Sequence, residues 1–203
     1  MRGNFLVGRE VIVDKNRLNI SSSDYSHLVS KLKLIEPRYA PTGTGSRAMF
    51  DFANLIQFGI FNFLKSSNVS RNSLTNIFEI VNRSISNKDL KDIENPFTLS
   101  WHPWSYRDLK PDPLKSKMAY IHICAYPCET IYSFRILKID KEKTPIFTAE
   151  YQQVDSGSLQ KLKPNTPYKE KDFDFVGEAP VHTTINLNSI NRYIRDLVSD
   201  LIE

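Results

Sequence analysis

The spacing of hydrophobic and polar positions predicts a helix over residues 21–33. Its apolar positions recur every three or four residues, as they do along one face of an α-helix: Tyr25, Leu28, Val29 and Leu32. Serine, histidine and lysine side chains occupy the opposite face. Ser21 or Ser23 can cap the first turn, because a serine hydroxyl accepts a hydrogen bond from an amide that has no partner inside the helix.

A shorter helix is predicted before it, over residues 10–18, where Val11 and Leu18 lie a heptad apart. Residues 18–21 would then form a tight link between the two helices. The alternative for the first segment is a strand, because residues 5–13 are rich in valine, which favours extended structure.

A small hairpin is predicted after residue 35. Glu36 precedes Pro37, and the residue before a proline is disfavoured in the helical conformation, so the helix ends here. Residues 38–50 then form two short extended arms around a turn that contains Gly43 and Gly45.

Two further helices complete the N-terminal part. Asp51 is placed to cap a helix that runs to about Lys65, and this helix is so apolar that we expect it to be buried. Residues 68–70 interrupt the chain and cap another helix, which ends near Arg83 and again has apolar residues three and four apart. We place a domain boundary at residue 95.

Beyond this boundary the sequence is typical of strands. Three segments are rich in isoleucine, tyrosine and phenylalanine: residues 118–126, 130–139 and 144–151. The basic segment 161–178 is predicted to be a loop. Five apolar residues then recur at alternate steps of three and four, which predicts a terminal helix: Leu187, Ile190, Ile194, Leu197 and Leu201. This apolar seam either contributes to a dimer interface or packs on its own sheet.

These elements together predict an α+β protein with two domains. Residues 1–95 would form a helical head that carries the hairpin. Residues 96–203 would form an antiparallel-sheet domain with a terminal helix, which serves dimerisation, sensing or partner binding.

Charge is unevenly distributed along the chain. Residues 1–78 contain ten basic and five acidic side chains, a net charge of +5, and because the whole chain carries +4 the remainder carries −1. A basic head suits a polyanion, since phosphate contacts supply most of the non-specific affinity of proteins for nucleic acid. The alternative is a basic surface that is merely solvated.

Composition restricts the class of protein further. The chain has 40% hydrophobic residues with only 7 glycines, 11 prolines and 2 cysteines, which excludes collagen-like, disordered and disulfide-scaffold proteins. No apolar run reaches the roughly 20 residues that a membrane span needs, and early charges interrupt any signal-peptide core. We therefore expect a cytoplasmic protein without a membrane partner.

One segment partly resembles a metal or thiol site. In an extended conformation, two-residue alternation would place His122, Cys124, Tyr126 and Cys128 on one face, which suggests metal or thiol sensing. Core packing is the favoured alternative, because no nearby pair supplies a further ligand. No Walker loop, nucleophile elbow or zinc-protease helix is present, so we expect neither enzymatic activity nor a cofactor.

Several short motifs in the first 83 residues, in this order and spacing, resemble the MerR family of bacterial transcription regulators. They are Leu18-Asn19-Ile20-Ser21 between two helices, Leu34-Ile35-Glu36-Pro37-Arg38 entering the hairpin, Gly45-Ser46-Arg47-Ala48-Met49-Phe50-Asp51 leaving it, and Val69-Ser70 before Leu74 and Ile77. The resemblance implies a winged helix-turn-helix in residues 8–83 and a homodimer that grips duplex DNA, with the C-terminal half sensing a small-molecule or protein effector. The glycine that commonly ends the recognition helix of that family is absent from Lys33-Leu34-Ile35.

The predicted DNA contacts lie on the second helix and the hairpin. Serine and histidine side chains can bond base edges or phosphate oxygens, and lysine and arginine neutralise phosphates. The residues are Ser22, Ser23, Ser26, His27, Lys31, Arg38, Tyr39 and Arg47. Arg47 matches the wing arginine of the resembled family. The alternative function is a ligand-binding or protein-interaction module in which the helix-turn-helix is only structural.

Overall fold

The computed structural model describes residues 5–43, 45–66, 71–86, 95–99, 101, 117–125, 130–139, 145–154, 160–161 and 181–202. The chain divides into two compact units. The first contains Met1–Phe78, Phe97–Leu99 and Ile190–Glu203, and the second contains Glu79–Pro96 and Ser100–Ser189. Helices, an antiparallel sheet and a C-terminal helix confirm the α+β class. The domains predicted at 1–95 and 96–203 stay a prediction.

The first unit begins with two short helices joined by a turn. Helix α1 (Arg9–Val13) ends earlier than predicted, because Asp14 is extended and its carboxylate accepts a hydrogen bond from the amide of Asn16. The prediction of a helix to residue 18 was therefore wrong. Helix α2 (Ser22–Ser26) continues directly into a π-helix, η1 (His27–Lys31), and Ser21 caps α2 by accepting a bond from the amide of Asp24.

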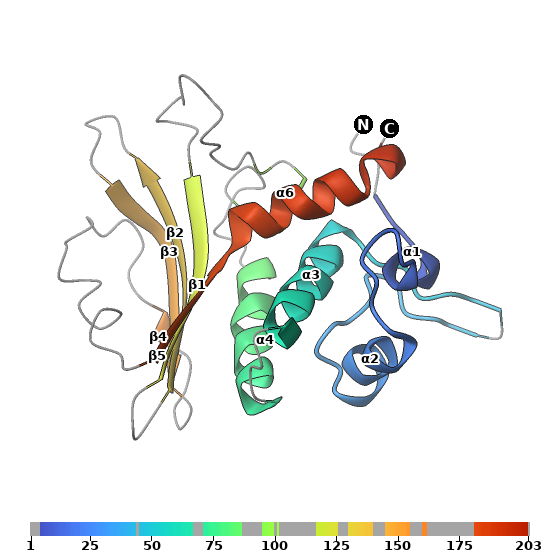
Figure 1. The fold of residues 1–203 in the computed structure, drawn as a ribbon, viewed down its shortest axis with the longest axis horizontal. Helices are drawn as coiled ribbons and strands as arrows, with labels where there is room; N and C mark the ends of the chain where they lie inside the picture. The colour runs from blue at the N-terminus through green and yellow to red at the C-terminus, as the bar shows by residue number, and fades with distance from the viewer. Residues whose placement is uncertain are drawn as a thin grey trace. The chain divides into compact units, whose positions relative to one another are not determined.

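A hairpin follows, as the sequence predicts. Its base is an antiparallel bridge between Tyr39 and Met49, and Phe50 forms a second bridge with Val7, ahead of α1. Gly45 has a φ of +90° in the turn, a conformation that few other residues adopt. Figure 1 shows the hairpin arms projecting past α1. The segment before α1 thus ties the hairpin to the helices.

Helix α3 (Phe52–Ser66) is buried along most of its length, as predicted. Asp51 caps it, since its carboxylate accepts the amide of Asn54 and its own amide donates to the Asn54 side chain. Asn54 in turn donates to the carbonyl of Glu36, which holds the start of the hairpin against this helix. Helix α4 (Arg71–Ile85) follows and extends two residues beyond the predicted end.

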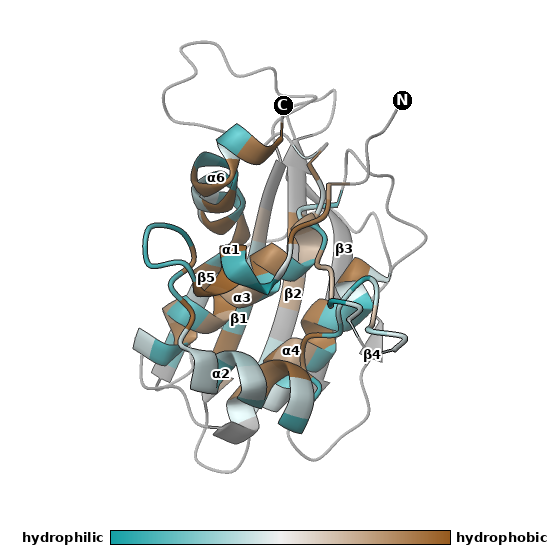
Figure 2. Ribbon diagram, turned by 90° about the vertical axis from the view of Figure 1, so that its right-hand side faces the viewer, coloured by the Kyte–Doolittle hydropathy of each residue, from teal (hydrophilic) through white to brown (hydrophobic). Residues whose placement is uncertain are grey.

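Helix α6 (Leu187–Leu197) approaches α3 so closely that one position of α3 has no room for a side chain. A Cβ atom on Gly59 would lie 3.0 Å from Ile190 Cγ2 and 3.1 Å from Ile194 Cδ1. Figure 2 shows α6 alternating between hydrophilic and hydrophobic residues, and the two isoleucines are buried. The predicted apolar seam therefore packs, at these two positions, on α3 of the same chain.

An arginine of α6 secures this contact. The half-buried guanidinium of Arg195 donates to the Asn191 side chain and to the carbonyl of Leu99, and lies 5.8 Å from the ring centroid of Phe52. Burial lowers the pKa of Arg195. The side chain joins α6, residues 97–99 and the start of α3.

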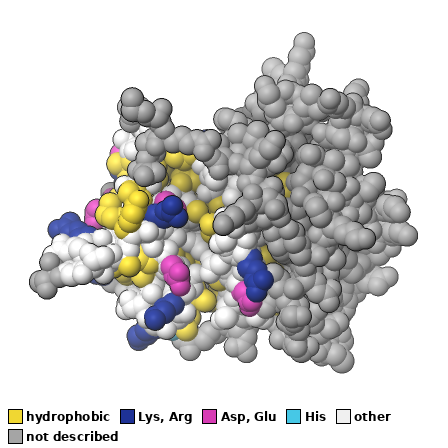
Figure 3. Space-filling view, turned by 180° about the vertical axis from the view of Figure 1, so that it is seen from behind, with side chains coloured by type: hydrophobic (Ala, Val, Ile, Leu, Met, Phe, Trp, Pro, Cys, Tyr) yellow, Lys and Arg dark blue, Asp and Glu magenta, His cyan; other side chains and the backbone are white. Residues whose placement is uncertain are grey.

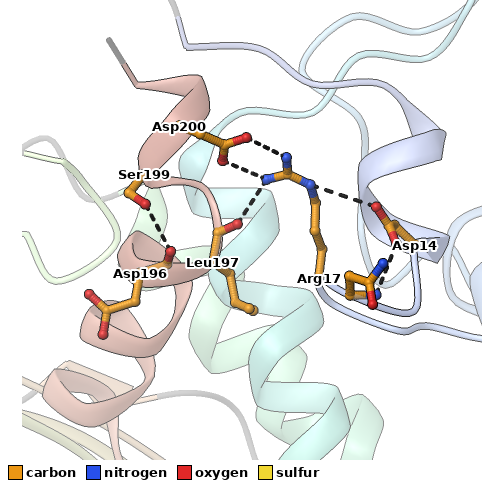
Figure 4. A network of polar contacts seen from close by, with 7 residues as sticks. Asp14, Arg17, Asp196, Leu197, Ser199 and Asp200 are labelled. Atoms are coloured by element: carbon orange, nitrogen blue, oxygen red, sulfur yellow. Dashed lines mark hydrogen bonds and ion pairs between the residues drawn. The ribbon is translucent and has the colours of Figure 1, made fainter.

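Arg17 binds the C-terminal end of α6 (Figure 4). Its guanidinium donates to both carboxylate oxygens of Asp200, at 2.9 and 2.7 Å, and to the carbonyl of Leu197 at 2.8 Å. The carbonyl belongs to the last turn of α6, where an arginine satisfies a group that has no partner inside the helix. Asp14 lies 3.8 Å away on the other side of the guanidinium. The turn after α1 is thus fixed to the C-terminal segment, which ends in the 3-10 helix η4 (Ser199–Leu201).

The second unit contains a five-stranded antiparallel sheet in the order β4-β3-β2-β1-β5. The strands are β1 (Lys117–Ala125), β2 (Thr130–Ile139), β3 (Pro145–Val154), β4 (Gln160–Lys161) and β5 (Val181–Asn186). On one face, Ile121 pairs with Phe134 and with Ile185, and all three are buried. This stripe forms the core of the sheet.

Three of the five strands agree with the predicted segments within a few residues, whereas β4 and β5 were not predicted. Residues 162–178 of the predicted loop lie outside the described residues. None of the helices in the described ranges combines the length and hydropathy needed to cross a membrane.

Replacing Gly59 by valine should destabilise the protein by about 1–3 kcal/mol, because the added carbons would enter space that Ile190 and Ile194 occupy. Urea denaturation measures the effect. The matched control is Ala53→Val on a half-exposed position of α3, which should cost only about 0.6 kcal/mol of helix propensity. Equal stability losses in the two variants would contradict the close contact.

Stability should depend on pH through Asp200. Its hydrogen bonds from Arg17 hold the pKa of the carboxyl below the ordinary 3.8, so the stabilisation is complete above that pH and is lost as the pH falls through the lowered value. Asp200→Asn should therefore lower the urea midpoint at pH 7, and the difference from the wild type should shrink below pH 3.8.

Asp196→Asn is the control, because the Asp196 carboxylate points away from Arg17 (Figure 4). That variant should follow the wild type across the same range. A pH-independent effect of Asp200→Asn would mean that the ion pair contributes nothing to stability.

Candidate nucleic-acid interface

The predicted contacts of the second helix lie on its solvent side. Ser22, Ser23, Ser26 and Lys31 are exposed and His27 is half-buried. The opposite side of the helix carries Tyr25 and Leu28, which are buried in the core. The helix therefore has the two faces that the sequence pattern predicts.

The second half of this helix is a π-helix, which the sequence did not indicate. The amide of Leu32 donates to the carbonyl of His27 at 2.9 Å, one residue further back than in an α-helix. Lys33 then adopts a φ of +52°, and the amide of Leu34 bonds to the carbonyl of Leu28. The left-handed conformation of Lys33 ends the helix at the position where a glycine is usual.

Asp24 is neutralised within the protein. It accepts hydrogen bonds from Lys65 Nζ at 2.6 Å and from the Ser21 hydroxyl at 2.6 Å. Burial raises the pKa of its carboxyl, but these bonds outweigh burial, and the net shift is downward. Ser23 also belongs to this group, with its hydroxyl 2.9 Å from that of Ser21. The acidic charge on the exposed helix is thus offset by a lysine of α3.

The predicted hairpin contacts are exposed on both arms. Arg38 and Tyr39 lie on the first arm, Arg47 lies on the second, and 49% of Tyr39 is accessible. Neither arginine forms a hydrogen bond or an ion pair with any residue that the structure describes, and the same holds for Lys31. Three cations of the candidate interface are therefore available to an external anion.

The hairpin has a rigid base. The buried ring of Phe50 packs edge-on against Tyr25 and Phe58, with ring centroids 5.9 and 5.6 Å apart. Since Phe50 comes three residues after Arg47, this aromatic cluster restricts the positions that the second arm of the hairpin can adopt. The ring of Phe50 thus anchors the base of the hairpin in the core of the first unit.

An open groove of about 490 Å³ lies where α1, α2 and the hairpin meet. Its walls are mostly apolar, and two arginines and one glutamate complete it: Arg9, Glu10, Val13, Tyr25, Pro41, Arg47 and Ala48. The guanidinium of Arg9 lies over the ring of Tyr25, 5.0 Å from its centroid. Arg9 and Arg47 thus line the same groove. The sequence did not indicate a role for Arg9, because Arg9 lies outside the second helix and the hairpin, where the DNA contacts were predicted.

Figure 3 shows a second property of the basic side chains. On the face drawn, the lysines and arginines of the described residues are separate spots, several beside an acidic side chain, rather than one continuous patch. On this face the basic side chains of the described residues therefore do not form one extended cationic surface.

The histidine and cysteine face of β1 is a separate polar cluster. His122 Nδ1 lies 3.2 Å from both His182 Nε2 and the Thr184 hydroxyl, and the latter two atoms are 2.9 Å apart. Burial lowers the pKa of His182. Cys124 is buried in the same strand, and Cys128 lies outside the described residues. In the described part of the chain, no three His, Cys, Asp or Glu side chains gather to hold a metal ion.

Comparison of the chain with protein-family models, with curated proteins and with solved structures found no match in any of the three.

Lys33→Gly should stabilise the protein by about 0.5–1 kcal/mol, because glycine has no Cβ to oppose a φ of +52°. Urea denaturation again gives the value. The control is Lys31→Gly inside η1, which should destabilise by about 1 kcal/mol through the flexibility of glycine. A loss of stability in Lys33→Gly would show that contacts of the lysine outweigh its backbone strain.

Proposed function

We propose that this chain is a sequence-specific DNA-binding transcription regulator of MerR-like type, with a winged helix-turn-helix in its first unit. The order α1, turn, α2, hairpin, α3, α4 supports the proposal, because it is the order that the resemblance implies. In this interpretation α2 with η1 is the recognition helix and residues 38–50 are the wing.

The observation that carries the proposal is the set of unpaired cations beside an exposed polar helix. Lys31, Arg38 and Arg47 have no anionic partner among the described residues, although acidic side chains are common on the same unit. An isolated arginine on a hairpin with a buried base is placed to bind a fixed anion. Phosphates along a duplex are such anions, and their contacts set the position of a protein on DNA.

The two parts of the interface would have different tasks. A helix of this width fits the major groove, where Ser22, Ser26 and His27 can form hydrogen bonds with base edges. Ser23 would contribute less, because its hydroxyl already lies in the capping group. Lys31, Arg38, Tyr39 and Arg47 would bind the backbone on either side and hold the helix in register.

Assembly as a homodimer and control by a small-molecule or protein effector complete the proposal. Both come from the resemblance, which implies two recognition helices on one operator. The second unit, with its sheet, is the candidate for sensing, and the site of action would be the cytoplasm. Stoichiometric titration of a bound duplex distinguishes one chain from two.

Selection from random duplexes, followed by fluorescence anisotropy, tests the function. The full chain should enrich a defined sequence, and the logarithm of its affinity should fall linearly with the logarithm of salt concentration with a slope of several units. Absence of binding to selected and random duplexes at low salt would favour an interaction module with a structural helix-turn-helix.

Arg47→Ala should weaken binding to all duplexes by a similar amount, about 1–3 kcal/mol, and should reduce the salt slope by about one unit. The reason is that an arginine holds phosphate with two hydrogen bonds and reads no base. Arg83→Ala on α4 is the matched control, since it removes the same charge from an exposed position outside the candidate interface. Unchanged affinity in a folded Arg47→Ala protein would exclude Arg47 from DNA binding.

A further inference from the structure

The groove between α1 and the hairpin contains a second arginine that belongs to neither the predicted recognition helix nor the predicted wing. Arg9 is exposed on the first turn of α1, and its guanidinium forms no hydrogen bond or ion pair with a described residue. The guanidinium lies over the ring of Tyr25, 5.0 Å from the centroid. This contact orients the side chain while leaving its hydrogen-bond donors available.

Arg9 and Arg47 line the same groove, although they come from different elements. Two guanidinium groups at one open site repel each other unless an anion lies between them. Within the lining, only the carboxylate of Glu10 has the opposite charge, and it folds back over Gly8, where it fills the space that a Cβ atom would need. The site is therefore complementary to an external anion.

The shape of the groove favours a chain-like anion. Val13, Pro41 and Ala48 give it apolar walls, and it opens to solvent beside the hairpin. A sugar-phosphate backbone combines a charged group with apolar carbon atoms, so that one phosphate can meet the arginines while the adjoining sugar lies on the walls. Tyr25, which is buried, also lines the groove.

We propose that Arg9 and Arg47 together hold one backbone phosphate of duplex DNA in this groove. The inference rests on the proposed function and adds to it a residue outside the resemblance. It places a DNA-backbone contact on α1, and it makes the hairpin and α1 two sides of a single phosphate site. Glu10, at the edge of that site, would oppose binding.

The test is a double-mutant cycle in the full chain, with a labelled random-sequence duplex measured by anisotropy over a range of salt concentrations. Arg9→Ala and Arg47→Ala should each weaken binding roughly tenfold. Because both side chains bind the same phosphate, the double variant should lose only about one unit of salt slope in total, and its loss of affinity should be smaller than the product of the two single losses.

Two further variants separate charge from structure. Glu10→Gln should tighten binding, because it removes the negative charge at the site. Arg9→Lys should retain the salt slope and lose part of the affinity, since lysine acts as a point charge without the two-bond geometry of arginine. Circular dichroism of every variant verifies that the fold is intact. Arg83→Ala again serves as the control for DNA binding.

The outcomes distinguish this inference from the function on which it rests. Normal binding by Arg9→Ala together with weak binding by Arg47→Ala would overturn the shared site and leave the regulator intact. Independent losses, with a reduction of about two units in slope, would show two phosphates instead of one and overturn the shared site as well. Failure of the wild-type chain to bind any duplex would overturn both proposals.

Discussion

The contact between α3 and α6 at Gly59 is the constraint on which the first unit depends. Ile190 and Ile194 occupy the space that a side chain on residue 59 would need. Side chains of α6 therefore lie close to the backbone of α3 at this position. Close approach of this kind buries apolar surface efficiently, but it tolerates little change of shape on either side. The other features of the unit, including the hairpin base and the Arg17 contact, are attached to elements that this packing holds in place.

The hairpin, although it lies at the surface, is held in position by contacts with α3. Phe50 packs against Phe58 of α3, and Asn54 of the same helix holds the carbonyl of Glu36 at the entry to the hairpin. Both ends of the hairpin are therefore fixed to α3. The turn at residue 45 is exposed and free of such contacts. Arg47 lies between the fixed base and the free turn, which gives it a limited range of positions.

Local structure could be predicted from the sequence where one residue determines it. The caps Ser21 and Asp51 act as predicted, because each needs only an oxygen and an amide close in the chain. The π-helix η1 and the left-handed Lys33 were missed, since apolar spacing does not distinguish one extra residue in a turn. Contacts between distant segments were missed for another reason: periodicity reports which side of an element is apolar and not what that side meets. The contact of Ile194 with Gly59 and the place of Arg9 in the groove both depend on tertiary contacts of this kind.

The contact of Arg17 with Leu197 has a consequence for the synthesis of the chain, because its two residues are 180 positions apart. A ribosome adds roughly 5–20 residues per second, so α3 emerges on the order of ten seconds before the helix that covers Gly59. During that interval the part of α3 around Gly59 lacks the helix that packs on it. Contacts this distant in sequence also slow folding, since a long loop must close before they form. The first unit therefore joins segments that are synthesised far apart in time, and the surface of α3 around Gly59 would need protection from aggregation until α6 is free.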